Sequence, residues 1–173
     1  MKQLITLLLL TYVNSVCGQS HFETIKESSG TVIFKGILNK DVLDNELSFK
    51  WMKQNTDSYK PDSTCVAMLK NQKDSVYLIV FAGTWCEDTQ NILPRFFKLI
   101  QQAGFPLTRV NLIGVDRSKK TIGSLSESMG VYNVPTIIVM KSGKEIGRVV
   151  EYGKYGIYDK ELGEILSGKS NKR

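Results

Sequence analysis

Short runs of apolar residues along the chain predict the strands of a β-sheet. The strongest run covers residues 75–83, SVYLIVFAG, where a continuous apolar segment between turn residues indicates a strand that is buried on both faces. Such a strand belongs in the centre of its sheet. Further strands, the last joined through a Ser142-Gly143 hairpin turn, are predicted at residues 31–38, 107–115, 135–140 and 145–152.

Other segments carry apolar residues at the spacing of a helix. Residues 86–103 place Ile92, Phe96 and Ile100 on one face and predict the longest helix. Asp44 is the expected N-cap of a helix over residues 44–54, with Leu47 and Trp51 on its apolar side. Three shorter helices are predicted at residues 61–71, which begin with Pro61, at residues 121–129 and at residues 159–166.

The order of these elements predicts the fold class. Helices alternate with buried strands, and a hairpin and a final helix follow. This order favours an α/β fold with a central mixed β-sheet flanked by helices on both faces.

The N-terminus has the three regions of a secretory signal peptide. Lys2 precedes an apolar block at residues 4–13, which is too short to span a bilayer, and small residues follow it. Val16 and Gly18 favour cleavage before Gln19, so we expect residues 1–18 to be a signal peptide and the protein to be exported to the periplasm or the extracellular space. Lipid attachment at Cys17 and an uncleaved anchor are the alternatives.

Charge and length exclude several classes of function. The net charge is +6, but the basic residues are scattered, with clusters only at Lys119-Lys120 and in the tail at residues 169–173. Scattered charge is typical of a solvated surface, so we expect no nucleic-acid binding. After cleavage the chain has the length of one domain. We expect a monomer with no stable membrane span.

Few residues are available for metal or acid-base chemistry. The single histidine, His21, lies near the new N-terminus, which argues against an imidazole metal site and against a Ser-His-Asp triad. We therefore expect no metal and no cofactor. Cys65 and Cys86 remain after cleavage. From helix and strand lengths we estimate their sulfur atoms to be more than about 10 Å apart, too far for a disulfide, so Cys65 is expected to be buried and inert. A disulfide between Cys65 and Cys86 is the alternative.

Cys86 is the candidate catalytic residue. It follows the strand at 75–83 and opens the long helix, where unpaired backbone N–H groups and the positive end of the helix dipole favour a thiolate. Glu87 and Asp88 place negative charge beside it and oppose the thiolate, although Asp88 alternatively serves to stabilise the helix start. The Thr89 hydroxyl, one turn into the helix, is expected to donate a hydrogen bond to the sulfur.

These motifs together resemble the thioredoxin superfamily. Trp85-Cys86 follows an apolar strand, Pro94 comes eight residues after the cysteine, Val134-Pro135-Thr136 opens a later strand, and a hairpin and a helix complete the chain. The resemblance covers residues 65–168, and residues 19–64 look like the N-terminal strand-and-helix extension of secreted relatives. It implies that the bond before Pro135 is cis, and that Val134, Pro135 and Thr136 form the substrate-docking edge beside Cys86.

Two departures from the family pattern bear on function. Thr89 stands where the second cysteine of a C-x-x-C motif would be, so Cys86 lacks the partner that closes a local disulfide. Val80 stands where many thioredoxins carry a buried acid that assists proton transfer. The first departure argues against turnover as a dithiol reductase, and the second means that the help of the buried acid is absent.

The sequence leaves two hypotheses of different class. In the first, the protein exchanges thiols and disulfides of proteins or small molecules through Cys86, with Trp85, Glu87, Asp88 and Thr89 as supporting residues, and an outside thiol resolves the mixed disulfide. In the second, it is a non-catalytic binding module that keeps the fold and its groove. Peroxide reduction by one cysteine lacks the expected arginine and threonine near the sulfur.

Overall fold

The structure is a computed structural model that describes residues 21–54 and 56–169. Six strands form one sheet in the order β1-β2-β4-β3-β5-β6. β3 is parallel to β4, and every other neighbouring pair is antiparallel. The strands are β1 (Phe22–Lys26), β2 (Val32–Leu38), β3 (Val76–Ala82), β4 (Val110–Gly114), β5 (Thr136–Lys141) and β6 (Lys144–Val150). The predicted central strand is therefore β3, between β4 and β5.

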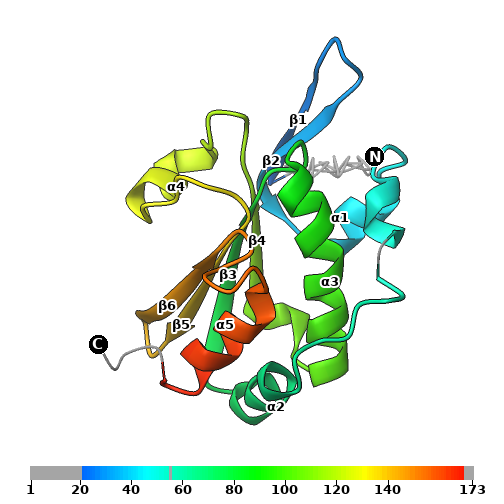
Figure 1. The fold of residues 1–173 in the computed structure, drawn as a ribbon. Coiled ribbons are helices and arrows are strands. Elements are labelled where there is room, and N and C mark those ends of the chain that lie inside the picture. Colours follow the sequence, from blue (N-terminus) through cyan, green and yellow to red (C-terminus); the bar gives the residue numbers. More distant parts are fainter. Residues whose placement is uncertain (1–20, 55, 170–173) are drawn as a thin grey trace, which may run out of the picture.

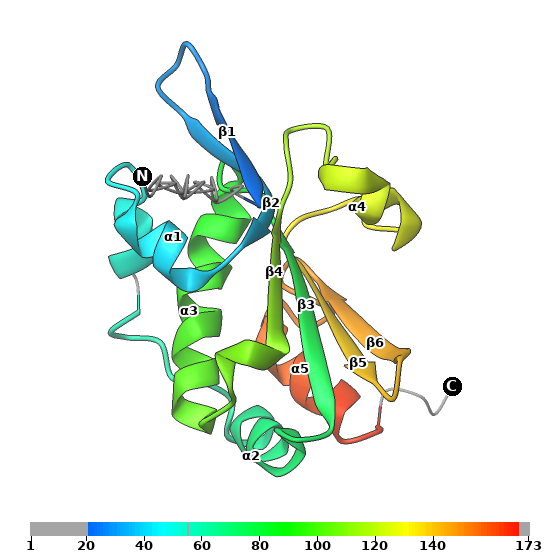
Figure 2. The same ribbon diagram turned by 180° about the vertical axis from the view of Figure 1, so that it is seen from behind.

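The helices cover the two faces of this sheet unequally. One face carries α1 (Lys40–Asn45), α2 (Ser63–Gln72), α3 (Glu87–Ala103) and α5 (Tyr158–Leu166), which share the larger hydrophobic core (Figure 1). The opposite face carries α4 (Leu125–Ser128) over a smaller core (Figure 2). The mixed, helix-flanked sheet predicted from the sequence is thus confirmed. Short 3-10 turns complete the chain at η1 (Lys50–Lys53), η2 (Leu107–Arg109) and η3 (Ile122–Ser124).

The alternation of side chains along β3 explains why its sequence is apolar throughout. Leu78 and Val80 point into the larger core, whereas Phe81 points into the smaller one. All three side chains are essentially inaccessible to solvent. Gly83 and Thr84, which follow the strand, are buried as well. The loop therefore begins in the interior and becomes partly exposed only at Trp85 and Cys86, just before α3.

The helix predicted at residues 44–54 is wrong. α1 begins four residues earlier, where the Asn39 side chain accepts a hydrogen bond from the Val42 N–H at 2.9 Å, and it ends at Asn45. The chain is extended at Glu46, and Leu47 is 90% exposed instead of packed. Asn39 is a favoured N-cap residue and was available closer to the end of β2. A separate 3-10 turn, η1, then buries Met52.

Two further elements differ from their predicted bounds. The strand predicted at residues 107–115 begins as the 3-10 turn η2 and becomes extended only at Val110. The helix predicted at residues 121–129 is interrupted at Gly123, whose φ of 65° is left-handed, and is divided into η3 and α4.

The described part of the N-terminal extension belongs to the same sheet. β2 pairs with β4 through residues Gly36 to Leu38, and β1 pairs with β2 as the outermost strand. Their hairpin rises beyond the end of the sheet at which α3 begins (Figure 1). The predicted signal peptide, residues 1–18, lies outside the described residues. Within the described ranges, no helix has the length and hydrophobicity needed to span a membrane.

The Thr84 hydroxyl replaces β4 as the partner of β2 where β4 has ended. β4 pairs with β2 only as far as Gly36, which leaves the same edge of β2 without a strand at Phe34 and Val32. There the Thr84 hydroxyl accepts from the Phe34 N–H at 3.2 Å and donates to the Val32 carbonyl at 3.1 Å. Thr84 is 1% exposed, so it holds the loop after β3 against the extension.

Replacing Thr84 with valine is therefore expected to destabilise the protein. Thr84→Val keeps the shape of the side chain but leaves a buried N–H and a buried carbonyl of β2 unpaired, which lowers the free energy of unfolding by about 1–3 kcal/mol. Urea denaturation measures this change. Thr121→Val is the matched control, because Thr121 is also buried and its hydroxyl has no partner among the described residues. Equal stability losses in the two variants would contradict the role assigned to Thr84.

Cys65 lies in the interface between α2 and α5. Its side chain is inaccessible, and α5 approaches so closely at Gly163 that a Cβ there would lie 3.0 Å from the Cys65 backbone nitrogen. Burial, with smaller contributions from the charges of Asp159 and Asp62, raises the pKa of the Cys65 thiol well above its ordinary value of 9.0. The folded protein therefore keeps this thiol protonated.

This burial predicts a loss of stability at alkaline pH. Above pH 9.0 the unfolded chain releases the Cys65 proton and the folded chain retains it. The unfolded state then binds fewer protons, so the free energy of unfolding falls as pH rises, by about 1.4 kcal/mol per pH unit for this group. Cys65→Ala is expected to show a correspondingly shallower alkaline decline in urea denaturation. Identical declines in both proteins would contradict the assignment.

Candidate functional site

Cys86 is the N-cap of α3, at the point where the chain leaves β3. A tight turn brings it there, because the Cys86 N–H donates to the Gly83 carbonyl at 2.8 Å. The Cys86 carbonyl accepts from the Gln90 N–H at 3.0 Å, which is the first hydrogen bond of the helix. The cysteine is half-buried and forms no disulfide. The structure thus places Cys86 at the start of a helix, as predicted.

The Cys86 sulfur lies against the loop before β5. Its thiol donates to the Val134 carbonyl at 3.3 Å, although the two residues are 48 positions apart in the sequence. The peptide bond between Val134 and Pro135 is cis. The side chains of Val134 and Pro135 are buried, and Cys86 packs against the smaller core, which contains Val134.

Trp85 packs against the loop between β3 and α3 and against the residues that follow β4. Its indole N–H donates to the Val115 carbonyl at 3.1 Å, and its ring lies so close to Gly83 that a Cβ there would be 2.9 Å from a ring atom. The charged groups of Arg117 and Lys119 lie 5.2 and 5.7 Å from the ring centre, within the range of cation–π interaction.

Arg117 also connects this tryptophan to the N-terminal hairpin. Its guanidinium forms a two-point ion pair with Glu27, at 2.6 and 2.8 Å, in the turn between β1 and β2. This pair lowers the pKa of the Glu27 carboxyl and raises that of Arg117, each through the hydrogen bonds between them. The hairpin thus reaches the indole that stands beside Cys86.

The interaction predicted for Thr89 is not the one observed. The Thr89 hydroxyl accepts from the Gly83 N–H at 3.2 Å, and no hydrogen bond joins it to the Cys86 sulfur among the described contacts. Thr89 is completely buried, because one turn into α3 its side chain points back beneath the loop. It therefore fixes the loop from below instead of acting on the thiol.

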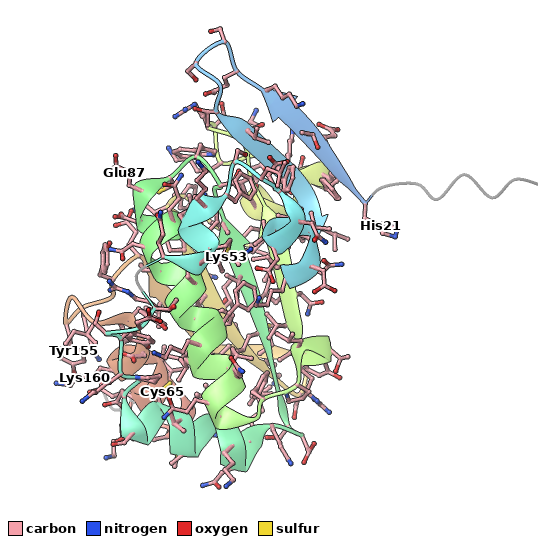
Figure 3. All side chains as sticks on the ribbon, turned by 90° about the vertical axis from the view of Figure 1, so that its right-hand side faces the viewer. His21, Lys53, Cys65, Glu87, Tyr155 and Lys160 are labelled. Carbon is pink, nitrogen blue, oxygen red and sulfur yellow. The ribbon has the colours of Figure 1, made fainter. Side chains whose placement is uncertain are left out.

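Glu87 and Asp88 occupy the first turn of α3, as predicted. Glu87 is the first residue of the helix and is exposed (Figure 3), and Asp88 is half-buried. Acidic residues in a first turn stabilise a helix through its dipole. Neither carboxylate has an ion-pair partner among the described residues, so both leave negative charge at the rim of the site.

Thr136 stabilises the turn before β5. It is 1% exposed and its hydroxyl donates to the Asn133 carbonyl at 2.7 Å. The Pro135 carbonyl accepts from the Glu151 N–H at 2.7 Å, which joins the same turn to the end of β6. The side chains of the segment predicted as the docking edge are therefore buried, and the exposed side chains directly before it are those of Tyr132, 77% accessible, and Asn133.

The two cysteines of the described residues do not meet. Both are free, and Figure 3 places Cys65 in α2, at the opposite end of α3 from Glu87. The prediction that they form no disulfide is confirmed. No group of three metal-ligating side chains occurs within the described ranges.

Several residues of the site escaped sequence analysis. Thr84 and Arg117 act through contacts with residues about 50 and 90 positions away, which no local pattern reveals. Gln90 holds the loop through a hydrogen bond from its side-chain amide to the Thr84 carbonyl at 2.9 Å. Its position four residues after Cys86, on the same side of the helix, is a local signal by which it could have been found.

Comparisons with known proteins agree with this geometry. A family model described as Thioredoxin matches residues 40–158. Thioredoxin-1 of Saccharomyces cerevisiae is 28% identical over 78 residues, which cover 45% of this chain and 70% of that protein.

Two solved structures are also similar. A protein of unknown function from Pseudomonas aeruginosa has a TM-score of 0.50 at 15% identity, and the match covers 78% of this chain and 93% of that one. Thioredoxin of Fasciola hepatica has a TM-score of 0.39 at 23% identity, over 57% of this chain and 86% of that one. The first likeness concerns the fold alone. Since the family model covers most of the chain and its matched segment contains Cys86 and Val134, the chain belongs to the thioredoxin family.

Proposed function

We propose that the protein exchanges thiols and disulfides through Cys86 alone. The observation that carries this proposal is the position of the Cys86 sulfur, which is half-buried at the N-terminus of α3 and 3.3 Å from the Val134 carbonyl. At a helix start, unpaired N–H groups attract the negative charge that a thiolate carries. A backbone edge beside it offers an extended client segment hydrogen-bonding groups.

The chemistry requires one sulfur of the protein and one disulfide of the client. The Cys86 thiolate attacks one sulfur of the client disulfide, a bond between Cys86 and that sulfur forms, and the other client sulfur leaves as a thiolate that takes a proton from water. An outside thiol then attacks the client sulfur of this mixed disulfide, and Cys86 leaves as a thiolate. No electrons are gained or lost by the protein over the two steps.

The lack of a second thiol determines how long the mixed disulfide lasts. In a C-x-x-C protein the second cysteine attacks the mixed disulfide from within the same helix turn. Here Thr89 occupies that position, with its hydroxyl bonded to the loop. Cys65 is buried in α2, near the end of α3 that lies opposite Cys86, so it does not take over this role. The mixed disulfide therefore persists until an outside thiol reaches it.

The clients and compartment follow from the same proposal. The residues next to the sulfur favour proteins or small molecules that carry a disulfide, with Tyr132 and the Val134 backbone as the docking edge. Residues 1–18 are proposed to direct the chain out of the cytoplasm. Disulfides persist in the oxidising compartments outside it. We propose that the protein acts there as a monomer without a cofactor.

Introducing the second cysteine tests this proposal directly. Wild-type protein treated with glutathione disulfide is expected to accumulate a glutathione adduct on Cys86 that persists after excess reagent is removed. Thr89→Cys is expected to shorten the lifetime of this adduct by at least about a hundredfold, because the introduced thiol attacks it intramolecularly at high effective concentration. Intact-mass spectrometry over time measures both lifetimes.

Thr89→Ser is the matched control, since it alters the same buried position without supplying a thiol. It is expected to keep the long-lived adduct, and Cys86→Ser is expected to form none. Absence of any adduct in the wild-type protein, with Thr89→Cys equally unreactive, would reject the redox proposal and favour a binding module that has kept the fold without the chemistry.

A further inference from the structure

β1 is an edge strand that lies outside the segment matched by the family model. That segment begins at residue 40, so it includes neither strand of the β1–β2 hairpin. The hairpin nevertheless rises at the end of the sheet where α3 begins (Figure 1). In its turn, Glu27 pairs with Arg117, whose guanidinium lies 5.2 Å from the centre of the Trp85 ring. An element added to the matched domain therefore reaches the residue next to Cys86.

The hydrogen bonds at the two ends of the hairpin show which backbone groups of β1 point outward. The Ile37 N–H donates to the His21 carbonyl, and the Glu27 N–H donates to the Thr31 carbonyl, both at 2.9 Å. Hydrogen-bonded and non-hydrogen-bonded pairs alternate in an antiparallel ladder, so every second residue between these two ends also faces β2. The residues whose N–H and carbonyl groups point to the opposite side are Phe22, Thr24 and Lys26.

The other edge of β2 agrees with this alternation. The Thr84 hydroxyl binds the Phe34 N–H and the Val32 carbonyl, so these two residues of β2 face away from β1. Phe34 lies opposite Thr24 in the register of the hairpin. Thr24 therefore belongs to a pair that exchanges no hydrogen bonds, and its own backbone groups point to the outer edge of the sheet.

The two outer strands of the sheet differ in how open they are to a further strand. The register of β6 with β5 shifts between Val139 and Met140, which indicates a bulge. β1 keeps an unbroken register with β2 over five residue pairs, contains no proline, and has four exposed residues of its five. Bulges and prolines keep edge strands from pairing with other chains, and β1 has neither. Its charged side chains, Glu23 and Lys26, carry one charge of each sign.

The separation between β1 and Cys86 is short enough for one client segment to reach both. Cys86 follows β3, which is three strands away from β1 in the order of the sheet. Neighbouring strands are about 4.8 Å apart, so the separation across the sheet is roughly 14 Å. An extended chain covers this distance in about four to five residues. A client that pairs with β1 can therefore bring a disulfide a few residues further along its chain to Cys86.

We propose that β1 binds an extended segment of a disulfide-bearing client protein as a further strand of the sheet. The outward N–H and carbonyl groups of Thr24 and Lys26 bind the client backbone, and this pairing holds the client disulfide near Cys86. Because main-chain hydrogen bonds supply the affinity, the preferred clients are flexible or unfolded chains, with little dependence on their sequence. This role of β1 rests on the proposed exchange at Cys86, whose class of client it names.

Two synthetic probes separate strand pairing from the chemistry. Both carry a cysteine in a mixed disulfide with thionitrobenzoate, a coloured leaving group. The long probe has five alternating threonine and valine residues, the length of β1, and a glycine-serine spacer of about five residues before the cysteine. The short probe has the spacer and the cysteine alone. The Cys86 thiolate attacks the probe's cysteine sulfur, a bond between these sulfurs forms, and thionitrobenzoate leaves with the electron pair of the broken bond.

Wild-type whole protein is expected to react with the long probe at least about tenfold faster than with the short probe, since pairing with β1 makes the attack intramolecular. Thr24→Pro removes an outward N–H, places its ring at the free edge and leaves the β1–β2 ladder intact. It is expected to reduce the advantage below about threefold without changing the short-probe rate. Thr24→Val is the matched control, because it keeps both the N–H and the strand propensity. Absorbance of the released thionitrobenzoate gives the rates.

A second measurement uses only the wild-type protein and so does not require that Thr24→Pro folds. Methylation of all five backbone nitrogens in the strand segment of the long probe removes its hydrogen-bond donors. The methylated probe is expected to react no faster than the short probe, because it can no longer pair with β1. A far-ultraviolet circular dichroism spectrum verifies the fold of each variant.

The outcomes distinguish the two claims. Lack of reaction with either probe would reject the exchange at Cys86 and the role of β1 with it. Equal rates for the two probes would leave the exchange standing and overturn the role of β1, as would an advantage of the long probe that survives both Thr24→Pro and methylation. Equal rates together with self-association that Thr24→Pro abolishes would assign the edge to a second copy of the chain.

Discussion

The antiparallel pairing of β3 with β5 is the constraint on which the site depends. Its register places Phe81, at the end of β3, opposite Thr136, at the start of β5. The loop leaving β3 and the loop entering β5 therefore meet at one edge of the sheet, and this brings the Cys86 sulfur to the Val134 carbonyl. A shift of one residue in this register would turn every side chain of β5 to the opposite face and separate the two loops.

The N-terminal extension supports the same edge of the sheet. Thr84 fills the gap beside β2 that β4 leaves, and the ion pair between Arg117 and Glu27 joins the hairpin to Trp85. The loop bearing Cys86 is thus held by the extension on one side and by Thr89 from below. α3 carries Cys86 at its start. Arg95, near its middle, lines a cavity together with Tyr59 and Tyr158.

The sequence predicted those features that arise from local pattern. The apolar run of β3, the helical spacing of α3 and the position of Cys86 between them needed no tertiary information. Thr84, Arg117 and the Thr89 hydrogen bond were missed because their partners are set by sheet register and by the path of the loop. The helix predicted at 44–54 failed because the spacing of Leu47 and Trp51 resembled an amphipathic face, whereas the nearer cap at Asn39 began the helix earlier.

We propose that Cys86 is a reactive thiol accessible from solvent, whereas the fold shields Cys65. Iodoacetamide labelling of the native protein, followed by peptide mapping, tests this most directly. The account predicts one carbamidomethyl group per chain, on Cys86, with Cys65 labelled only after unfolding in denaturant. Protection of Cys86 in the native state, or labelling of both cysteines at the same rate, would contradict it.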